Sequence, residues 1–355
     1  MRATALACAL APDLDAAVER LTGTPIAPGR TPCGAWPYFA IPLSGSDWMK
    51  RAEALARAVA DGLQREAALP SADWAALPCL VGSSSHSVGA WDEGGWQALR
   101  PPAEFSRTLA QWFGMRGPAM MINTACTSGL SALDLAATLI AAGKFRDVLV
   151  LGVELVNRLT VAGFAGLELL SASRARPCDR ERDGLVLGEA LGAVLVSAER
   201  GRWRVAGLGC EMDAASLTGP APDGAVIADA MRAALATARW ASAEVELIKL
   251  QAGGGPLADL AEARAIRQVF AAPPRAVSLK GAIGHTLGAS GPAEMALLLR
   301  SLERGCVPET WGFAAPDEAL GFAPSGGGQA QVSRVLFNLS GFGGNVMSLA
   351  LERAR

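Results

Sequence analysis

The sequence predicts an α/β protein in which strands and helices alternate through two similar halves. Short apolar runs, typical of buried strands, alternate along the chain with longer segments of helical periodicity. The chain is 51% hydrophobic and 19% charged and contains 40 glycines, a composition that suits a large buried core. After Trp203 the pattern restarts, because Val205 to Leu208 is similar to Thr4 to Leu10. We therefore expect an N-terminal half over residues 1–200 and a C-terminal half over residues 201–355.

The individual elements follow from apolar runs and from helix start and stop signals. A first helix is expected over residues 14–21, another from about residue 128 to Gly143, and a third over residues 292–304, where Pro292 suits the first turn and Gly305 the end. Residues 154–190 are rich in Arg, Gly and Ser, which favours a lid or a dimer segment. The expected strands, in chain order, are 80–82, 119–122, 148–153, 193–196, 204–207, 247–250, 276–279 and 335–339.

Cys126 lies where an expected strand meets an expected helix. At such a junction, unpaired backbone N–H groups and the helix dipole favour an anion, so we expect a stabilised thiolate with a lowered pKa. The neighbours Ala125, Ser128 and Gly129 are small and would let a substrate approach the sulfur. A buried structural cysteine is the alternative interpretation of this segment taken alone.

Two further segments are rich in glycine and carry side chains suited to chemistry. His285, one of two histidines in the chain, lies in the glycine-rich segment from Lys280 to Gly291, between an expected strand and an expected helix. A histidine in such a loop is suited to act as an acid, a base or a hydrogen-bond donor. Phe342 lies in a glycine turn that runs from Asn338 to Asn345, and its position among small residues suggests that the ring guards a cavity.

These segments, in this order, resemble the β-ketoacyl-ACP synthases, which are condensing enzymes of the thiolase superfamily. The nucleophile motif is matched by Thr124 to Gly129, the lysine–histidine motif by Lys280 to Gly291, and the C-terminal glycine turn by Asn338 to Gly344. The stretch from Arg176 to Ala190 supplies a fourth match, so the resemblance extends from about residue 80 to the C-terminus. It implies a thiolase-like fold, with two duplicated βαβαβ halves in a layered α-β-α-β-α arrangement and the active site where the halves meet.

The resemblance also implies roles for individual residues. Cys126 would be the nucleophile, and His285 would hold the thioester oxygen of the extender unit. The backbone N–H groups of Cys126 and Phe342 would stabilise an oxyanion, and the Phe342 ring would gate the acyl channel. Glu189 and Lys280 would form a buried ion pair behind the site that orients His285.

One loop departs from the family pattern. Gln251 stands where the family usually has a first catalytic histidine, and Gly253 and Gly255 replace two threonines that hold the phosphopantetheine arm. A glutamine amide also donates a hydrogen bond without carrying a charge, so we expect Gln251 to assist His285. With Gly253 and Gly255, Asn345 completes the expected substrate-binding set.

Composition and cysteine spacing limit the cofactors, partners and location. A net charge of −2 disfavours nucleic acid as a partner, and the seven cysteines are scattered, so neither a metal site nor a disulfide framework is expected. We see no signal peptide or membrane-spanning stretch in the sequence and expect a cytoplasmic protein. The resemblance implies no bound cofactor, substrates carried on the phosphopantetheine of an acyl carrier protein, and a homodimer or a heterodimer with a ketosynthase homologue.

Three functions remain open on the sequence. The first is loading of an acyl group on Cys126, followed by decarboxylative condensation with a malonyl thioester. The second is acyl transfer from Cys126 to an oxygen or nitrogen nucleophile without condensation, which the altered Gln251 loop favours. The third is a chain-length-factor-like partner of an active ketosynthase, which the altered Gln251 loop also favours and against which the retained Cys126, His285 and Phe342 argue.

Overall fold

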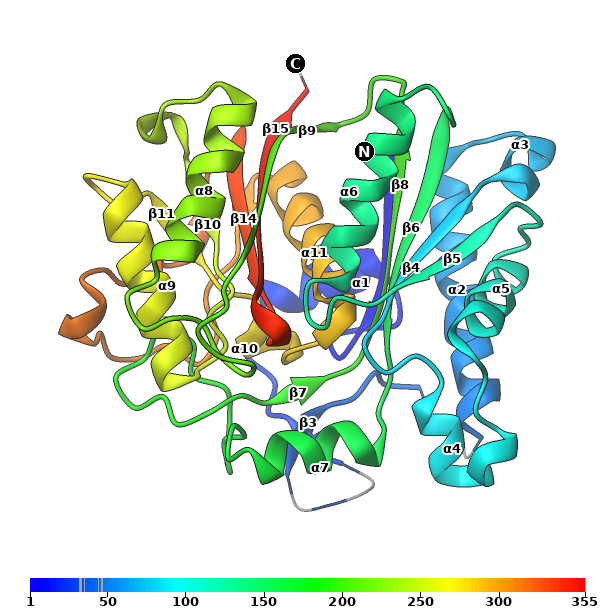
Figure 1. The fold of residues 1–355 in the computed structure, drawn as a ribbon, viewed down its shortest axis with the longest axis horizontal. Helices are drawn as coiled ribbons and strands as arrows, with labels where there is room; N and C mark the ends of the chain where they lie inside the picture. Colours follow the sequence, from blue (N-terminus) through cyan, green and yellow to red (C-terminus); the bar gives the residue numbers. More distant parts are fainter. Residues whose placement is uncertain (32–33, 35, 44, 46, 355) are drawn as a thin grey trace.

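Two five-stranded sheets stand face to face, with helices between them and on both outer faces (Figure 1). The computed structural model describes residues 1–31, 34, 36–43, 45 and 47–354, so Cys33, one of the seven scattered cysteines, lies outside the described residues. The layers alternate as α-β-α-β-α, which is the arrangement predicted from the sequence.

The two sheets have the same topology. Their orders are β1-β8-β6-β4-β5 and β9-β15-β14-β10-β11, so each runs first, fifth, fourth, second, third among its own strands. In each sheet three strands are parallel, and the two at the other edge pair antiparallel. The strands are β1 (Ala3–Cys8), β4 (Cys79–Gly82), β5 (Ala119–Ile122), β6 (Asp147–Glu154), β8 (Ala190–Ser197), β9 (Trp203–Met212), β10 (Leu247–Lys249), β11 (Arg275–Val277), β14 (Arg334–Ser340) and β15 (Asn345–Arg353).

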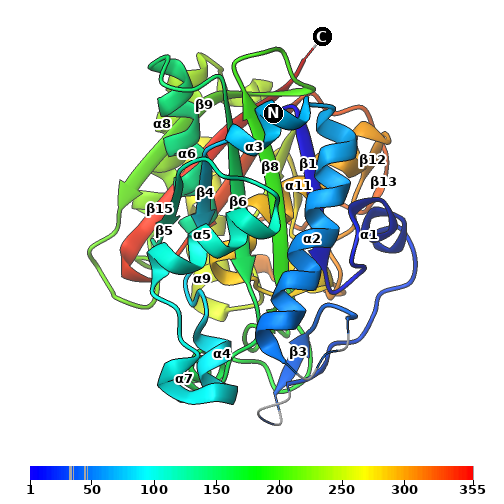
Figure 2. The ribbon, with the colours of Figure 1, turned by 90° about the vertical axis from the view of Figure 1, so that its right-hand side faces the viewer.

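The helices form three layers around these sheets. Figures 1 and 2 show α2 and α5 on the outer face of the first sheet, and Figure 1 shows α8 and α9 outside the second sheet and α6 and α11 between the two. The helices of these layers are α1 (Leu14–Leu21), α2 (Trp48–Ala67), α5 (Pro102–Trp112), α6 (Ser128–Ala141), α8 (Ala225–Ala238), α9 (Pro256–Val269) and α11 (Ser290–Glu303).

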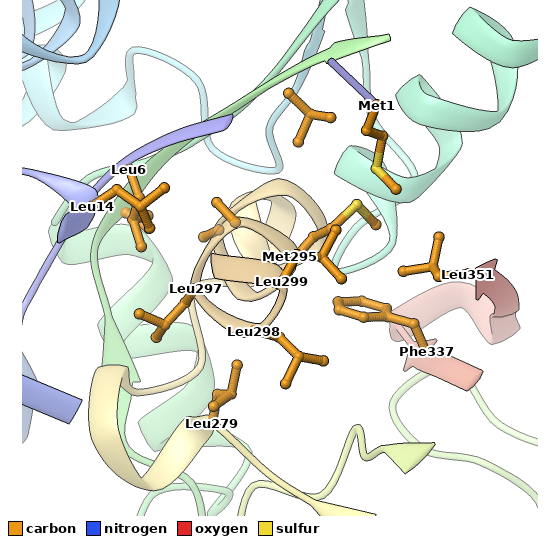
Figure 3. Packing of buried hydrophobic residues seen from close by; sticks show 14 of the residues in the cluster. Met1, Leu6, Leu14, Leu279, Met295, Leu297, Leu298, Leu299, Phe337 and Leu351 are labelled. Atoms are coloured by element: carbon orange, nitrogen blue, oxygen red, sulfur yellow. The ribbon is translucent and has the colours of Figure 1, made fainter. Parts of the chain in front are cut away.

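Helix α11 is the centre of the core. It is buried over nearly its whole length, because apolar side chains of both sheets close around it. Figure 3 shows Leu6 of β1 on one side of this helix and Phe337 of β14 and Leu351 of β15 on the other. A helix whose faces are mostly apolar is suited to this central position.

The expected connector over residues 154–190 contains a short helix and a strand. Helix α7 (Arg158–Gly166) and strand β7 (Leu187–Gly188) lie here, and β7 pairs with β3 (Pro37–Phe39) of the N-terminal segment. No helix in the described ranges is both long and apolar enough to cross a bilayer. The remaining elements are β2 (Gly29–Arg30), α3 (Ser71–Ala76), α4 (Val88–Gly94), α10 (Lys280–Ile283), β12 (Cys306–Val307), β13 (Gly328–Gln329) and five 3₁₀ turns at 95–97, 242–244, 287–289, 318–320 and 342–344.

Candidate active site

Cys126 lies in a tight turn between β5 and α6. The turn is held by hydrogen bonds from the Thr127 hydroxyl to the Thr124 carbonyl (2.7 Å) and from the Ser128 hydroxyl to the Ala125 carbonyl (2.5 Å). Ala125 adopts a φ of 54°, a left-handed conformation that is uncommon for alanine. The turn thereby places the Cys126 side chain, which is 4% exposed, at the amino end of α6.

His285 of the second half meets this thiol. The imidazole Nε2 lies 3.1 Å from Cys126 Sγ, within the range of a sulfur hydrogen bond. The backbone of His285 is fixed to the first half, because its N–H donates to the Val186 carbonyl (2.8 Å) and its carbonyl accepts from Gly188 N (3.0 Å). The Ser290 hydroxyl lies 3.4 Å from Nδ1 on the other side of the ring. The structure therefore joins the two predicted residues into one pair.

Burial sets the protonation of this pair and corrects one expectation. The sequence predicted a lowered pKa for Cys126, but desolvation raises its pKa to about 11, although backbone N–H groups of Phe342 and Cys126 and the charge of Lys280 lower it. Burial, followed by the charge of Lys280, lowers the pKa of His285 to about 3. The resting pair is thus a neutral thiol beside a neutral imidazole, and the helix terminus does not outweigh the loss of water.

Two aromatic rings cover the pair. The Phe342 ring stacks on Phe164 with centroids 5.1 Å apart and planes 13° apart, and Phe164 packs edge-on against His285 at 6.5 Å. Phe164 belongs to α7, inside the segment that the sequence assigned to a lid or dimer contact, and no motif marked it. The one available signal was an aromatic residue isolated in the glycine- and alanine-rich stretch around it.

A cavity of about 550 Å³ extends from Cys126 and His285 along the second half, and Gln251, Gly253, Gly255 and Phe342 all line it. The Gln251 N–H donates to Glu262 Oε1 (2.8 Å), which fixes the backbone, while the buried side-chain Oε1 of Gln251 has no hydrogen-bond partner. This oxygen can only accept a hydrogen bond, so the structure leaves its acceptor capacity unused.

Gly253 and Gly255 differ in the space around them. A Cβ at position 253 would lie 2.6 Å from Leu185 Cδ2 and 3.2 Å from Lys280 Cδ, so Leu185 occupies the volume that a threonine would need. A Cβ at position 255 would approach only Ala258, at 3.7 Å. The cavity wall is therefore apolar at position 253 and open at position 255.

The expected ion pair between Glu189 and Lys280 does not form. Glu189 is fully buried and pairs with Arg51, whose Nη2 lies 2.6 Å from Glu189 Oε2, whereas Lys280 Nζ lies 2.5 Å from Glu294 Oε1. Arg51 belongs to α2, outside the stretch that carried the resemblance, so the motifs gave no partner for Glu189. Glu189 fixes loops of the first half through the N–H groups of Ile41 and Val156, while Lys280 lies behind His285.

Asn345 is the one expected substrate-binding residue that the structure does not bring to the cavity. It begins β15, where it pairs with Met212 of β9, and it is not among the residues that line the cavity. In the described part of the chain, no group of three or more His, Cys, Asp or Glu side chains is arranged to hold a metal ion.

Comparisons with known proteins identify the family of the chain. The N-terminal and C-terminal domain models of β-ketoacyl synthases match residues 97–200 and 203–314. A ketoacyl synthase alpha subunit of the tetracenomycin polyketide synthase of Streptomyces glaucescens is 33% identical over 275 residues, which cover 72% of this chain and 64% of that protein. A 3-oxoacyl-[acyl-carrier-protein] synthase 2 of Coxiella burnetii is 33% identical over 261 residues, covering 68% and 63%. The matches thus span less than two thirds of these relatives.

Solved structures share the fold over the whole chain. A β-ketoacyl synthase from Burkholderia phymatum superposes with a TM-score of 0.87 at 23% identity, covering 100% of this chain and 99% of that one. A ketosynthase in complex with its chain length factor from Xenorhabdus doucetiae gives 0.83 at 24% identity, with coverages of 100% and 97%. Both domain models describe the same family, and the thiolase-like fold and the placement of Cys126 beside His285 are consistent with that family. The chain belongs to the β-ketoacyl synthase family.

Proposed function

We propose that this chain is a carrier-dependent ketosynthase, which loads an acyl group on Cys126 and condenses it with a malonyl thioester. The observation that carries the proposal is the 3.1 Å contact between Cys126 Sγ and His285 Nε2, at the end of a cavity that Gln251 also lines. A nucleophile paired with a base in a largely apolar cavity is the arrangement that acyl transfer needs.

In the loading step, the Cys126 sulfur attacks the carbonyl carbon of an acyl thioester while His285 takes the thiol proton. The negative oxygen of the tetrahedral intermediate is held by the N–H groups of Cys126 and Phe342, which lower the pKa of the Cys126 thiol in the resting site. The carbon–sulfur bond to the carrier then breaks, and the leaving thiolate takes the proton from His285. Charge is neutral before and after the step, which suits the buried neutral pair.

In the condensation step, the malonyl thioester loses its carboxylate as carbon dioxide, and the electron pair of the broken bond forms an enolate. His285 and the amide of Gln251 hold the enolate oxygen by hydrogen bonds, the second without a charge. The enolate carbon attacks the acyl carbonyl on Cys126, and the cysteine leaves as a thiolate. The products are a β-ketoacyl thioester on the carrier, carbon dioxide and, after protonation, the free thiol.

The chemistry needs an acyl carrier protein as donor and no resident cofactor. The relative from Coxiella burnetii is named for its acyl carrier protein, and one matching structure is that of a carrier protein in complex with its ketosynthase. We place the protein in the cytoplasm, where such carriers act. We also propose a dimer, with a second copy or with a homologue, formed through the first sheet. Strand β5 lies at the edge of that sheet, and its Met120 is 54% exposed.

Non-condensing acyl transfer is the second candidate, and the Gln251 loop favours it. The cavity has an amide in place of a titratable donor, and Leu185 fills the place of one arm-binding hydroxyl. In this case a hydroxyl or amine would attack the acyl group on Cys126, with His285 taking its proton.

Intact-mass measurement after incubation with acyl carriers, combined with carbon dioxide release from a malonyl carrier, separates these functions. The proposal expects one acyl adduct that Cys126→Ala removes, and carbon dioxide release by the wild type. Cys210→Ala is the matched control, because Cys210 is exposed and its loss should leave the adduct in place. An adduct without carbon dioxide indicates transfer alone, and no adduct with short, long or aryl donors indicates a partner subunit.

A further inference from the structure

A cluster of buried charges lies behind the candidate active site. Glu294 of α11 accepts from two ammonium groups, with Lys280 Nζ 2.5 Å from its Oε1 and Lys249 Nζ 2.7 Å from its Oε2. None of the three side chains is more than 1% exposed. The Lys249 ammonium also lies 4.0 Å from the ring centroid of Phe337, which adds a cation–π contact. Glu294 therefore pairs with two lysines, Lys280 and Lys249.

Lysine is rare in this chain, which makes its use here informative. Only four of the 32 basic residues are lysines, and the other two, Lys50 and Lys144, are exposed. Everywhere else the chain uses arginine. An ammonium is a compact charge that one carboxylate and an aromatic face can satisfy, whereas a guanidinium presents five donors in a rigid plane. Two lysines therefore converge where a small cation is needed.

Lys249 connects the two loops that carry the proposed donors. It ends β10, two residues before Gln251, while Lys280 begins α10, five residues before His285. On the other side, Glu262 of α9 accepts the N–H groups of Gln251 and Ala252, both at 2.8 Å. The charge of Glu262 acts favourably on the Lys249 ammonium. Charges thus alternate in sign from Lys280 through Glu294 and Lys249 to Glu262.

We propose that Lys249 is a positioning residue: through Glu294 it holds the Gln251 loop at a fixed distance from the His285 loop. The spacing of the two donors matters because both must reach one enolate oxygen, so this part of the inference rests on the proposed condensation. The effect of the Lys249 charge on the pKa of His285 is a separate consequence of the same cluster and does not depend on which reaction the chain performs.

The groups that face His285 support the direction of this effect. Burial is the largest cause of the lowered pKa of His285. The charges of Lys280 and Lys249 also lower this pKa, the charge of Glu294 raises it, and the Cys126 thiol that faces Nε2 is neutral. Lys249 is the smallest of these causes, so removing its charge should raise the pKa of His285 only in part, and burial and Lys280 still keep the imidazole neutral near pH 7. Burial lowers the pKa of Lys249 itself to about 7, with Glu294 the largest opposing cause.

The first test measures the two histidines by NMR in the whole protein. With isotope-labelled histidine, Lys249→Met should raise the pKa of His285, because one of the two cations that lower it is removed. His86, the other histidine, should titrate as before and is the internal control. A His285 titration that Lys249→Met does not move overturns the electrostatic role.

The second test measures turnover with a malonyl carrier. Lys249→Met should lower kcat for carbon dioxide release by about 10- to 100-fold, because small misplacements of reacting groups have effects of this size. KM for the carrier and the loading of Cys126 should stay within about twofold, and Lys144→Met, an exposed lysine, should behave as wild type. Unchanged kcat in Lys249→Met overturns the positioning role, whereas a wild type that releases no carbon dioxide overturns the condensation and leaves the His285 test standing.

A measurement on the wild type keeps the inference testable if Lys249→Met does not fold. In protein with labelled lysine, exposed ammonium groups exchange their protons rapidly with water, and buried paired ones exchange slowly. We expect two persistent ammonium signals at neutral pH or just below it, from Lys249 and Lys280. A single persistent signal would show that Lys249 is not held as a charged partner of Glu294, and the inference would then be wrong.

Discussion

His285 Nε2 and Cys126 Sγ lie 3.1 Å apart although 159 residues separate them in the sequence. Cys126 follows β5 of the first sheet and His285 follows α10 of the second half, so their contact exists only when the two halves are packed together. Hydrogen bonds between the His285 backbone and Val186 and Gly188 hold the loop against the first half. The reactive pair is thus a product of the interface between halves.

The first prediction concerns the reactivity of Cys126 as a function of pH. Its pKa is raised to about 11, chiefly by burial, so below that pH the thiol dominates and the thiolate, which is the reactive form, is a small fraction. Alkylation by iodoacetamide, followed by peptide mass mapping, should therefore accelerate about tenfold per pH unit from 7 to 10. A plateau that begins near neutral pH would instead show a thiolate–imidazolium pair.

The second prediction concerns the buried carboxylate of Glu189. Arg51→Met removes its ion-pair partner and leaves a fully buried charge, so the free energy of unfolding should fall by about 3–5 kcal/mol in urea titrations. Arg57→Met is the matched control, because Arg57 pairs with Glu53 on the exposed face of the same helix and should change stability by less than about 1 kcal/mol. Similar effects of the two substitutions would contradict a structural role for the Arg51–Glu189 pair.

The individual strands and helices were predictable because they depend on local patterns, whereas the layered fold and the reactive pair were expected from the resemblance to the ketosynthases. The strand Ala119–Ile122 and the helix Leu14–Leu21 have the predicted bounds, since apolar periodicity and the residues at their ends set both. Strand β9 extends to Met212, beyond the predicted residue 207, because it pairs with β15 along its whole length. The division of the chain at residue 200 stays a prediction.

The surroundings of the site were not predictable from motifs. The partner of Glu189 comes from α2, and the partner of Lys280 comes from α11, and nothing in the sequence states which buried charges meet. The direction of the Cys126 pKa was predicted wrongly because the helix terminus can be read from sequence, whereas the depth of burial, which decides the sign, cannot. Leu185 fills the space beside Gly253 for the same reason, since it arrives from a distant loop.

The third prediction tests whether the Leu185 side chain fills the space beside Gly253. Gly253→Thr should lower the free energy of unfolding by about 1–3 kcal/mol, because its Cβ would lie 2.6 Å from Leu185 Cδ2. The double variant Gly253→Thr with Leu185→Ala should recover part of this loss and should also lower KM for an acyl carrier, since a hydroxyl then faces the arm. Thermal unfolding and loading kinetics measure the two effects. If Gly253→Thr is as stable as the wild type, Leu185 does not restrict the site.

The fourth prediction concerns assembly through the first sheet. We expect a dimer in sedimentation experiments, alone or with a homologue, and Met120→Lys should weaken it because it places a charge on the exposed edge strand β5. Met212→Lys is the matched control, since Met212 is 61% exposed and belongs to β9, at the edge of the second sheet. A stable, active monomer would contradict the prediction, and dissociation by Met212→Lys alone would place the interface on the other sheet.

The last prediction concerns Gln251, which lines the same cavity as Cys126 and His285. If its amide holds the enolate oxygen, Gln251→Ala should lower carbon dioxide release from a malonyl carrier by about 10²–10³-fold, the usual effect of removing one oxyanion donor. Loading of Cys126 should remain nearly intact, because the backbone N–H groups of Cys126 and Phe342 serve that step. Gln251→His should preserve or raise the rate, and His285→Ala should lower it further than Gln251→Ala, because it also removes the base beside the thiol. Intact mass and carbon dioxide release, measured on the same samples, separate the two steps. Unchanged turnover in Gln251→Ala would leave the amide without a role in condensation and would favour transfer of the acyl group to another nucleophile.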